Sequence, residues 1–223
     1  MLRAFFLAAV LLAVSAFADD ISGPLRMTLV TESWGTVYYL PADLKDYDYT
    51  PGEGLRTMVG KLGKVTIADA GIGSYNVTFP KGSMQVEGVK GGAKVTFFGQ
   101  KYSFLRVKEG EVDELRVTTP TDTIRYVMTP HAIAINGKKG HTKITETEGD
   151  YQVISSAGSY SYKPTDSGGF SIRGAPLVRF PYLWRGALFQ SAGVGVFIDF
   201  KKLDPGEVLF RFSEWQPMLT VTR

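Results

Sequence analysis

The chain has 223 residues, with 25 basic and 22 acidic side chains, two histidines and no cysteine. This near-neutral balance lacks the clustered Lys and Arg that are typical of nucleic-acid binders, so no nucleic-acid partner is expected. Without cysteine the chain has no disulfide bonds and no thiol nucleophiles, and its apolar core alone must hold the fold together.

The first eighteen residues have the features of a cleavable secretory signal. Arg3 is the only charge before Asp19, and an apolar run extends from Ala4 to Val14. Ala16 and Ala18 match the A-x-A pattern of a signal-peptidase site. A membrane-spanning helix needs about 20 predominantly apolar residues, and this run is shorter. We expect cleavage after Ala18, a periplasmic or extracellular location and no transmembrane helix in the mature chain. The absence of cysteine from an exported chain favours a location in a bacterial cell envelope over secretion from an animal cell.

Short segments with alternating apolar and polar positions recur from residue 25 onward, separated by Gly, Pro, Asn or Asp. They include residues 25–29, 63–68, 74–79, 93–98, 123–127 and 207–212. This pattern predicts strands joined by turns. No segment after the signal keeps a 3.6-residue apolar period over three turns, so few or no long helices are expected. We predict that residues 19–223 form a single all-β domain. An antiparallel sandwich, a curved open sheet and a small barrel of short strands all fit.

Residues 112–163 are the most regular part of the chain and predict antiparallel strands joined by tight turns. Glycine indicates turns at residues 90–92, 136–137 and 167–169. Ile133 and Ile135 alternate with alanines and are expected to face the core. In residues 141–148 only Ile144 is apolar, which predicts a mostly solvated strand or a sheet edge.

Few residues offer recognisable catalytic or metal-binding chemistry. His131 and His141 flank the expected Asn136-Gly137 turn, where they could approach one another, but no third metal ligand is evident. The chain has no Gly-x-Ser-x-Gly motif, and neither histidine neighbours a triad partner. We therefore assign no metal, cofactor or catalytic residue from the sequence.

Two acidic groups suggest weaker alternatives. Glu146, Glu148 and Asp150 alternate along one expected strand, which is compatible with glycoside hydrolysis. A solvated edge strand explains the same pattern. Asp46, Asp48 and Glu53 suggest a calcium loop, but their spacing departs from the EF-hand pattern.

Aromatic and arginine side chains mark the candidate binding residues. Residues 174–196 are strongly apolar, and they combine aromatic rings with arginine as protein interfaces do. A short helix from Tyr182 to Ala192 is one expectation here, and a crossover that plugs one end of the core is the other. Tyr160 and Tyr162 are two positions apart on an expected strand, so both rings lie on one face. The candidate ligand-binding or partner-binding residues are Arg179, Phe180, Tyr182, Trp184, Arg185, Phe189, Tyr160 and Tyr162.

These features support three functional hypotheses. The leading one is an exported, non-catalytic binding or cell-envelope protein that presents an apolar or aromatic surface to a lipid, a glycan or a protein. The alternative is a secreted glycoside hydrolase that uses carboxylates. The third, an outer-membrane barrel, is disfavoured by polar residues on both faces of the strands. Nothing in the sequence specifies an oligomeric state.

Overall fold

The secondary structure of the described residues consists of strands in two sheets, which confirms the all-β prediction. The computed structural model describes residues 27–32, 35–41, 47–50, 52–71, 73–167, 170–174, 182, 184, 186–192, 194–200 and 219–223. The expected signal at residues 1–18 lies outside these residues. None of the described residues belongs to a helix that is long and apolar enough to cross a membrane.

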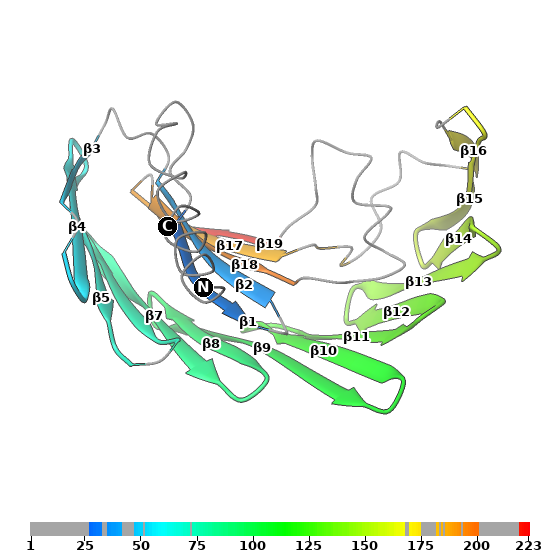
Figure 1. Cartoon of the computed structure of the whole chain (residues 1–223), viewed down its shortest axis with the longest axis horizontal. Coiled ribbons are helices and arrows are strands. Elements are labelled where there is room, and N and C mark those ends of the chain that lie inside the picture. The colour runs from blue at the N-terminus through cyan, green and yellow to red at the C-terminus, as the bar shows by residue number, and fades with distance from the viewer. Residues whose placement is uncertain are drawn as a thin grey trace, which may run out of the picture.

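The larger sheet has 14 strands, and each strand pairs antiparallel with its neighbours in the sequence. Its strands are β3 (Tyr47–Thr50), β4 (Leu55–Gly60), β5 (Gly63–Asp69), β6 (Tyr75–Phe79), β7 (Gly82–Val89), β8 (Gly92–Phe97), β9 (Gln100–Glu109), β10 (Val112–Thr118), β11 (Thr123–Thr129), β12 (Ala132–Gly137), β13 (Gly140–Thr147), β14 (Asp150–Ser155), β15 (Gly158–Pro164) and β16 (Phe170–Gly174). β3 and β16 are the two edge strands, so the sheet is open. It curves into a broad trough (Figure 1). Of the three expected architectures, the curved open sheet is therefore the one present.

The smaller sheet has five strands in the order β1-β2-β18-β17-β19. They are β1 (Met27–Glu32), β2 (Gly35–Pro41), β17 (Gly186–Ser191), β18 (Val194–Asp199) and β19 (Leu219–Thr222). β17 and β19 run parallel, whereas the other pairs are antiparallel. This sheet lies within the concave side of the larger one (Figure 1).

The core forms between the two sheets because interior strands of the larger sheet, such as β6 and β11, alternate between a buried and a solvated face. In β6 the burial pattern alternates strictly, and in β12 Ile133 and Ile135 are buried as expected. From the smaller sheet, Phe189 packs edge-on against three rings of β8 and β9, with centroids 4.9 to 6.1 Å apart: Phe97, Tyr102 and Phe104. Phe200, which follows β18, contacts Phe104 and Tyr126. The concave face of the middle strands is thus filled by side chains of the second sheet.

Two local predictions are wrong, and a third is confirmed in only one of its two alternatives. The turn expected at Asn136-Gly137 lies two residues later, at Lys138-Lys139, and Asn136 and Gly137 belong to β12. Contacts of this turn with Asp122 and Tyr182, which lie far away in the sequence, accompany the shift.

The segment expected as a mostly solvated or edge strand is β13. It is not an edge strand, because it pairs with β12 and β14, but only two of its eight residues are buried, as expected of a mostly solvated strand. Its inward positions Thr142 and Ile144 are buried, so one apolar residue and one threonine are enough to cover this part of the core.

The short helix considered for residues 182–192 is largely replaced by β17. This strand pairs with β18 on one side and β19 on the other. Its alternation places Ala187 and Phe189 in the core, which a helical spacing would not do.

Candidate functional site

An open depression of about 620 Å³ lies at one rim of the larger sheet, between the β10–β11 and β12–β13 turns. Six of its eight lining residues have polar or charged side chains, and the full lining consists of Pro120, Thr121, Asp122, Thr123, Arg125, Asn136, Gly137 and Lys138. Arg125 and Asn136 are directly opposite one another on β11 and β12, on the solvated outer face. Guanidinium, amide, hydroxyl and carboxylate groups therefore converge on one surface.

The β10–β11 turn is built by local chemistry. Pro120 supplies the backbone angle that the second position of a tight turn favours. The Thr119 hydroxyl oxygen accepts a hydrogen bond from the Asp122 backbone N–H at 3.0 Å, and the Thr119 N–H donates to the Asp122 carbonyl at 2.8 Å. Hydroxyl side chains commonly stabilise turns in this way. The turn holds Asp122 at the rim of the depression.

Tyr182 supports this rim from the core side. Its hydroxyl donates to Asp122 Oδ2 at 2.5 Å and accepts a hydrogen bond from the Lys139 backbone N–H. The buried Tyr126 hydroxyl donates to the Tyr182 carbonyl at 2.8 Å. The Tyr182 ring passes so close to Gly137 that a Cβ there would lie 2.6 Å from Cζ. The side chain and backbone of Tyr182 thus tie both turns to the interior.

Tyr182 itself has a positive φ of 59°, a conformation that few residues other than glycine adopt. Its carbonyl also accepts a hydrogen bond from the Trp184 N–H at 2.7 Å. Such a conformation persists where surrounding contacts over-determine it. The hydrogen bonds of the hydroxyl and the carbonyl supply those contacts.

The charge of Asp122 is stabilised by its neighbours. Burial raises the pKa of Asp122, but hydrogen bonds from the Tyr182 hydroxyl and the backbone N–H groups of Lys138 and Thr123 outweigh it, and the charge of Lys138 adds to them. The net result is a pKa of Asp122 below its ordinary value, so the carboxylate is ionised at neutral pH. The Lys138 ammonium lies beside it and donates to the Thr121 carbonyl at 2.6 Å.

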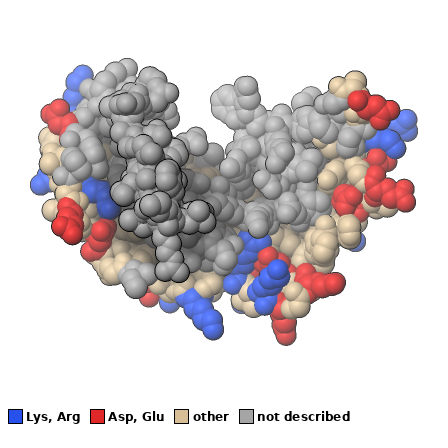
Figure 2. Space-filling model, viewed as in Figure 1, with Lys and Arg blue, Asp and Glu red and all other residues tan. Residues whose placement is uncertain are grey.

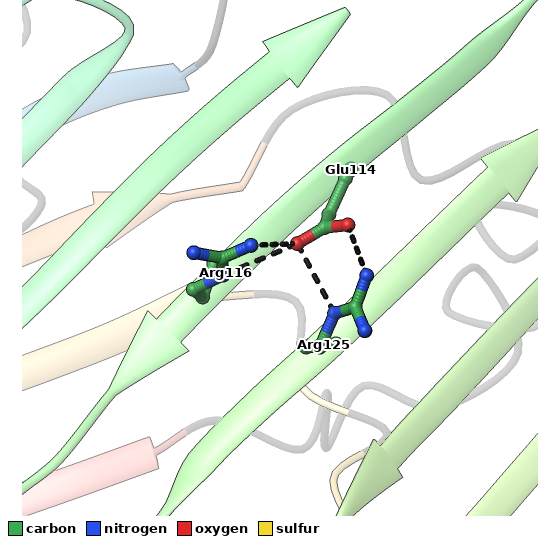
Figure 3. A network of polar contacts seen from close by, with 3 residues as sticks. All are labelled: Glu114, Arg116 and Arg125. Carbon is green, nitrogen blue, oxygen red and sulfur yellow. Dashed lines mark hydrogen bonds and ion pairs between the residues drawn. The ribbon is translucent and has the colours of Figure 1, made fainter.

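Glu114, Arg116 and Arg125 form a polar cluster next to the depression (Figure 3). Arg125 donates through Nε and Nη2 to the two carboxylate oxygens, at 3.2 and 2.6 Å. Arg116 donates through Nε and Nη2 to Glu114 Oε1, at 3.2 and 2.8 Å. The hydrogen bond from Arg125 is the largest cause that lowers the pKa of Glu114 to about 2. Figure 2 shows Lys and Arg side chains, with Asp and Glu beside them, below the middle of the trough, where β10 and β11 lie in Figure 1.

Of the candidates from the apolar segment, the three described ones are buried or partly buried against the core. Phe189 is 0% exposed and Tyr182 is 4% exposed, and Trp184 packs edge-on against Tyr182 with centroids 5.5 Å apart. Phe189 therefore has a packing role in this structure, and Tyr182 supports the depression from below. Arg179, Phe180 and Arg185 lie outside the described residues.

Tyr160 and Tyr162 lie together on the inward face of β15, as their spacing predicts. Tyr162 is buried and packs edge-on against Tyr151 of β14, with centroids 5.7 Å apart. Burial, with the nearby Tyr151 and Tyr160, raises the pKa of Tyr162 to about 12. Tyr160 is partly buried against the same core. A ligand-binding role for this pair stays a prediction.

The carboxylates considered for hydrolysis are not on one strand. Glu148 lies in the β13–β14 turn with a positive φ of 53°, Glu146 belongs to β13 and Asp150 to β14. Glu146 Oε2 contacts His131 Nδ1 at 2.8 Å, and this contact is the main cause that lowers the pKa of Glu146. A glycosidase acid needs a raised pKa, so Glu146 is poorly suited to that role.

The two histidines are separated by the length of β12. His131 follows β11 in the β11–β12 turn, whereas His141 pairs with Asn136 near the opposite end of the strand. The shared metal site that their flanking positions suggested therefore does not form. In the part of the chain that the structure describes, no three His, Asp or Glu side chains gather as metal ligands would.

The sequence did not reveal the residues of the depression as a group, because they come from two strands, β11 and β12, and two turns. Glu114 and Arg116 have the spacing that places two side chains on one strand face. That signal was available, but their association with Arg125 depends on the strand register.

Comparisons with protein-family models, with curated proteins and with solved structures each found no significant match.

Proposed function

We propose that this chain is an exported, non-catalytic binding protein of the cell envelope, and that the depression between the β10–β11 and β12–β13 turns receives a glycan. The single observation that carries the proposal is that six polar or charged side chains converge on this depression. Sites that fix a ligand's orientation use a few converging polar groups, and sugar hydroxyls match the donors and acceptors present here.

The packing of the core favours a glycan over lipid cargo. A lipid chain needs an apolar space, but Phe189 and Phe200 fill the concave side of the middle strands. The depression instead opens on the solvated face, where Arg125 and Asn136 are exposed. A polar ligand can bind there without displacing core side chains.

The test is binding of the purified chain to an array of neutral and acidic oligosaccharides. We expect retention of at least one saccharide class, and Asn136→Ala should weaken it about threefold to tenfold through loss of a hydrogen bond. Gln152→Ala removes the same amide from the outer face of β14 and serves as the matched control, with no expected effect. Absence of saccharide binding, together with co-purification of lipid or a protein, would overturn the glycan assignment.

Export is supported by the sequence of residues 1–18 and has its own test. Protein recovered from its native host should begin at Asp19, which intact-mass measurement would establish. Recovery of a chain that still begins at Met1 would contradict export by this signal.

A further inference from the structure

The two guanidinium groups beside the depression keep most of their hydrogen-bonding capacity. A guanidinium has five N–H donors. Among the described residues, Arg116 and Arg125 each direct Nε and Nη2 toward Glu114, which leaves both donors of Nη1 on each residue. Their side chains are 52% and 55% exposed, whereas that of Glu114 is 19% exposed. The carboxylate is thus enclosed while both guanidinium groups face solvent.

The second carboxylate of the site is also turned toward the protein. Asp122 accepts hydrogen bonds from the Tyr182 hydroxyl and from the Lys138 backbone N–H. The Lys138 ammonium has a neutral acceptor, the Thr121 carbonyl. Counting Arg116, Arg125 and Lys138 against Glu114 and Asp122 gives three positive and two negative charges, a surplus of one.

From this arrangement we infer that the depression selects glycans that carry an acidic group, a carboxylate or a sulfate, held by Arg125 and Lys138. The inference rests on the proposed glycan-binding function and names the class of its ligand. Arginine forms paired hydrogen bonds with carboxylate and sulfate-like oxygens, and a second cation strengthens the attraction. Glu114 competes with the ligand for Arg125, because its carboxylate accepts hydrogen bonds from Nε and Nη2 of that residue.

The experiment uses matched pairs of oligosaccharides that differ only in charge. One pair is an oligogalacturonide and its methyl ester, and the other is a sulfated oligosaccharide and its desulfated form. Calorimetric titration of the full exported chain should show at least one acidic member binding about tenfold more tightly than its neutral partner. This preference should weaken as salt concentration rises.

Three variants separate this site from a general charge effect. Arg125→Gln should remove the preference for the acidic member, whereas Glu114→Gln should increase affinity for it, because it removes a competing negative charge. Arg173→Gln removes an exposed arginine from the outer face of β16 and should change nothing. Opposite effects at neighbouring positions are not expected from partial unfolding, and circular dichroism of each variant checks the fold.

The outcomes distinguish the two proposals. Equal affinity for both members of each pair would overturn the acidic specificity and leave the glycan function standing. Binding of neither member of any pair, on the array or in solution, would overturn both. Binding to anionic phosphatidylglycerol vesicles without any saccharide binding would assign the cationic groups to a lipid surface and also refute the inference.

Discussion

Replacing Tyr182 with Phe should destabilise the protein by about 2 kcal/mol at pH 7. The ring remains in place, so the change removes only the hydroxyl, which donates to Asp122 and accepts from the Lys139 N–H. Hydrogen bonds to charged groups contribute about 1.5–3 kcal/mol, more than bonds between neutral groups. Asp122 keeps its hydrogen bonds from the Lys138 N–H, which limits the loss. Urea unfolding of both proteins, followed by circular dichroism, measures the difference.

The same variant should show a pH dependence of defined sign. Because the pKa of folded Asp122 lies below its ordinary 3.8, its stabilising contribution is complete above that value and is lost as pH falls through the folded pKa. The loss of unfolding free energy that Tyr182→Phe causes should therefore be smaller at pH 3 than at pH 7. Tyr126→Phe is the control, because it removes a bond to the Tyr182 carbonyl, and its deficit should not depend on pH. A deficit for Tyr182→Phe below 0.5 kcal/mol at pH 7, an order-of-magnitude bound from ordinary surface substitutions, would refute this role of the hydroxyl.

Three further variants test other parts of the structure, each by urea unfolding. Phe189→Ala should lower the free energy of unfolding by about 3–5 kcal/mol, because it opens a cavity among three aromatic rings. A loss under about 1 kcal/mol would mean that Phe189 does not belong to the core. Gly137→Ala should lower the free energy of unfolding by about 1–3 kcal/mol, since the new Cβ overlaps the Tyr182 ring. An unchanged stability would show that the Tyr182 ring does not pack against Gly137. Glu114→Gln should lower stability by about 1 kcal/mol at pH 7. The wild-type advantage should fall as pH drops from 4.5 to about 2, because Glu114 of the unfolded chain binds a proton over this range while the folded carboxylate stays ionised, and a constant difference would contradict the paired state of Glu114.

The proposed site could be inferred from the sequence only in part. Pro120 and Asp122 mark a turn, and the alternation of β10 shows that Glu114 and Arg116 share one face. The position of Arg125 next to Glu114 follows from the pairing of β10 with β11, which depends on which residues form the intervening turn. Tyr182 is 60 residues away from Asp122, so no local pattern connects the two.

Local chemistry was sufficient to predict the all-β class, the antiparallel pairing of neighbouring strands and the inward orientation of Ile133 and Ile135, because alternation and short turns act over a few residues. It was insufficient for the β12–β13 turn, because Asn136 and Gly137 do not form that turn. Contacts of Lys138 with Asp122 and of Gly137 with Tyr182 are found there instead. It also could not assign Phe189, whose apolar ring suits either a binding surface or a core. That choice depends on whether another layer covers the ring, and the second sheet places it against Phe97, Tyr102 and Phe104.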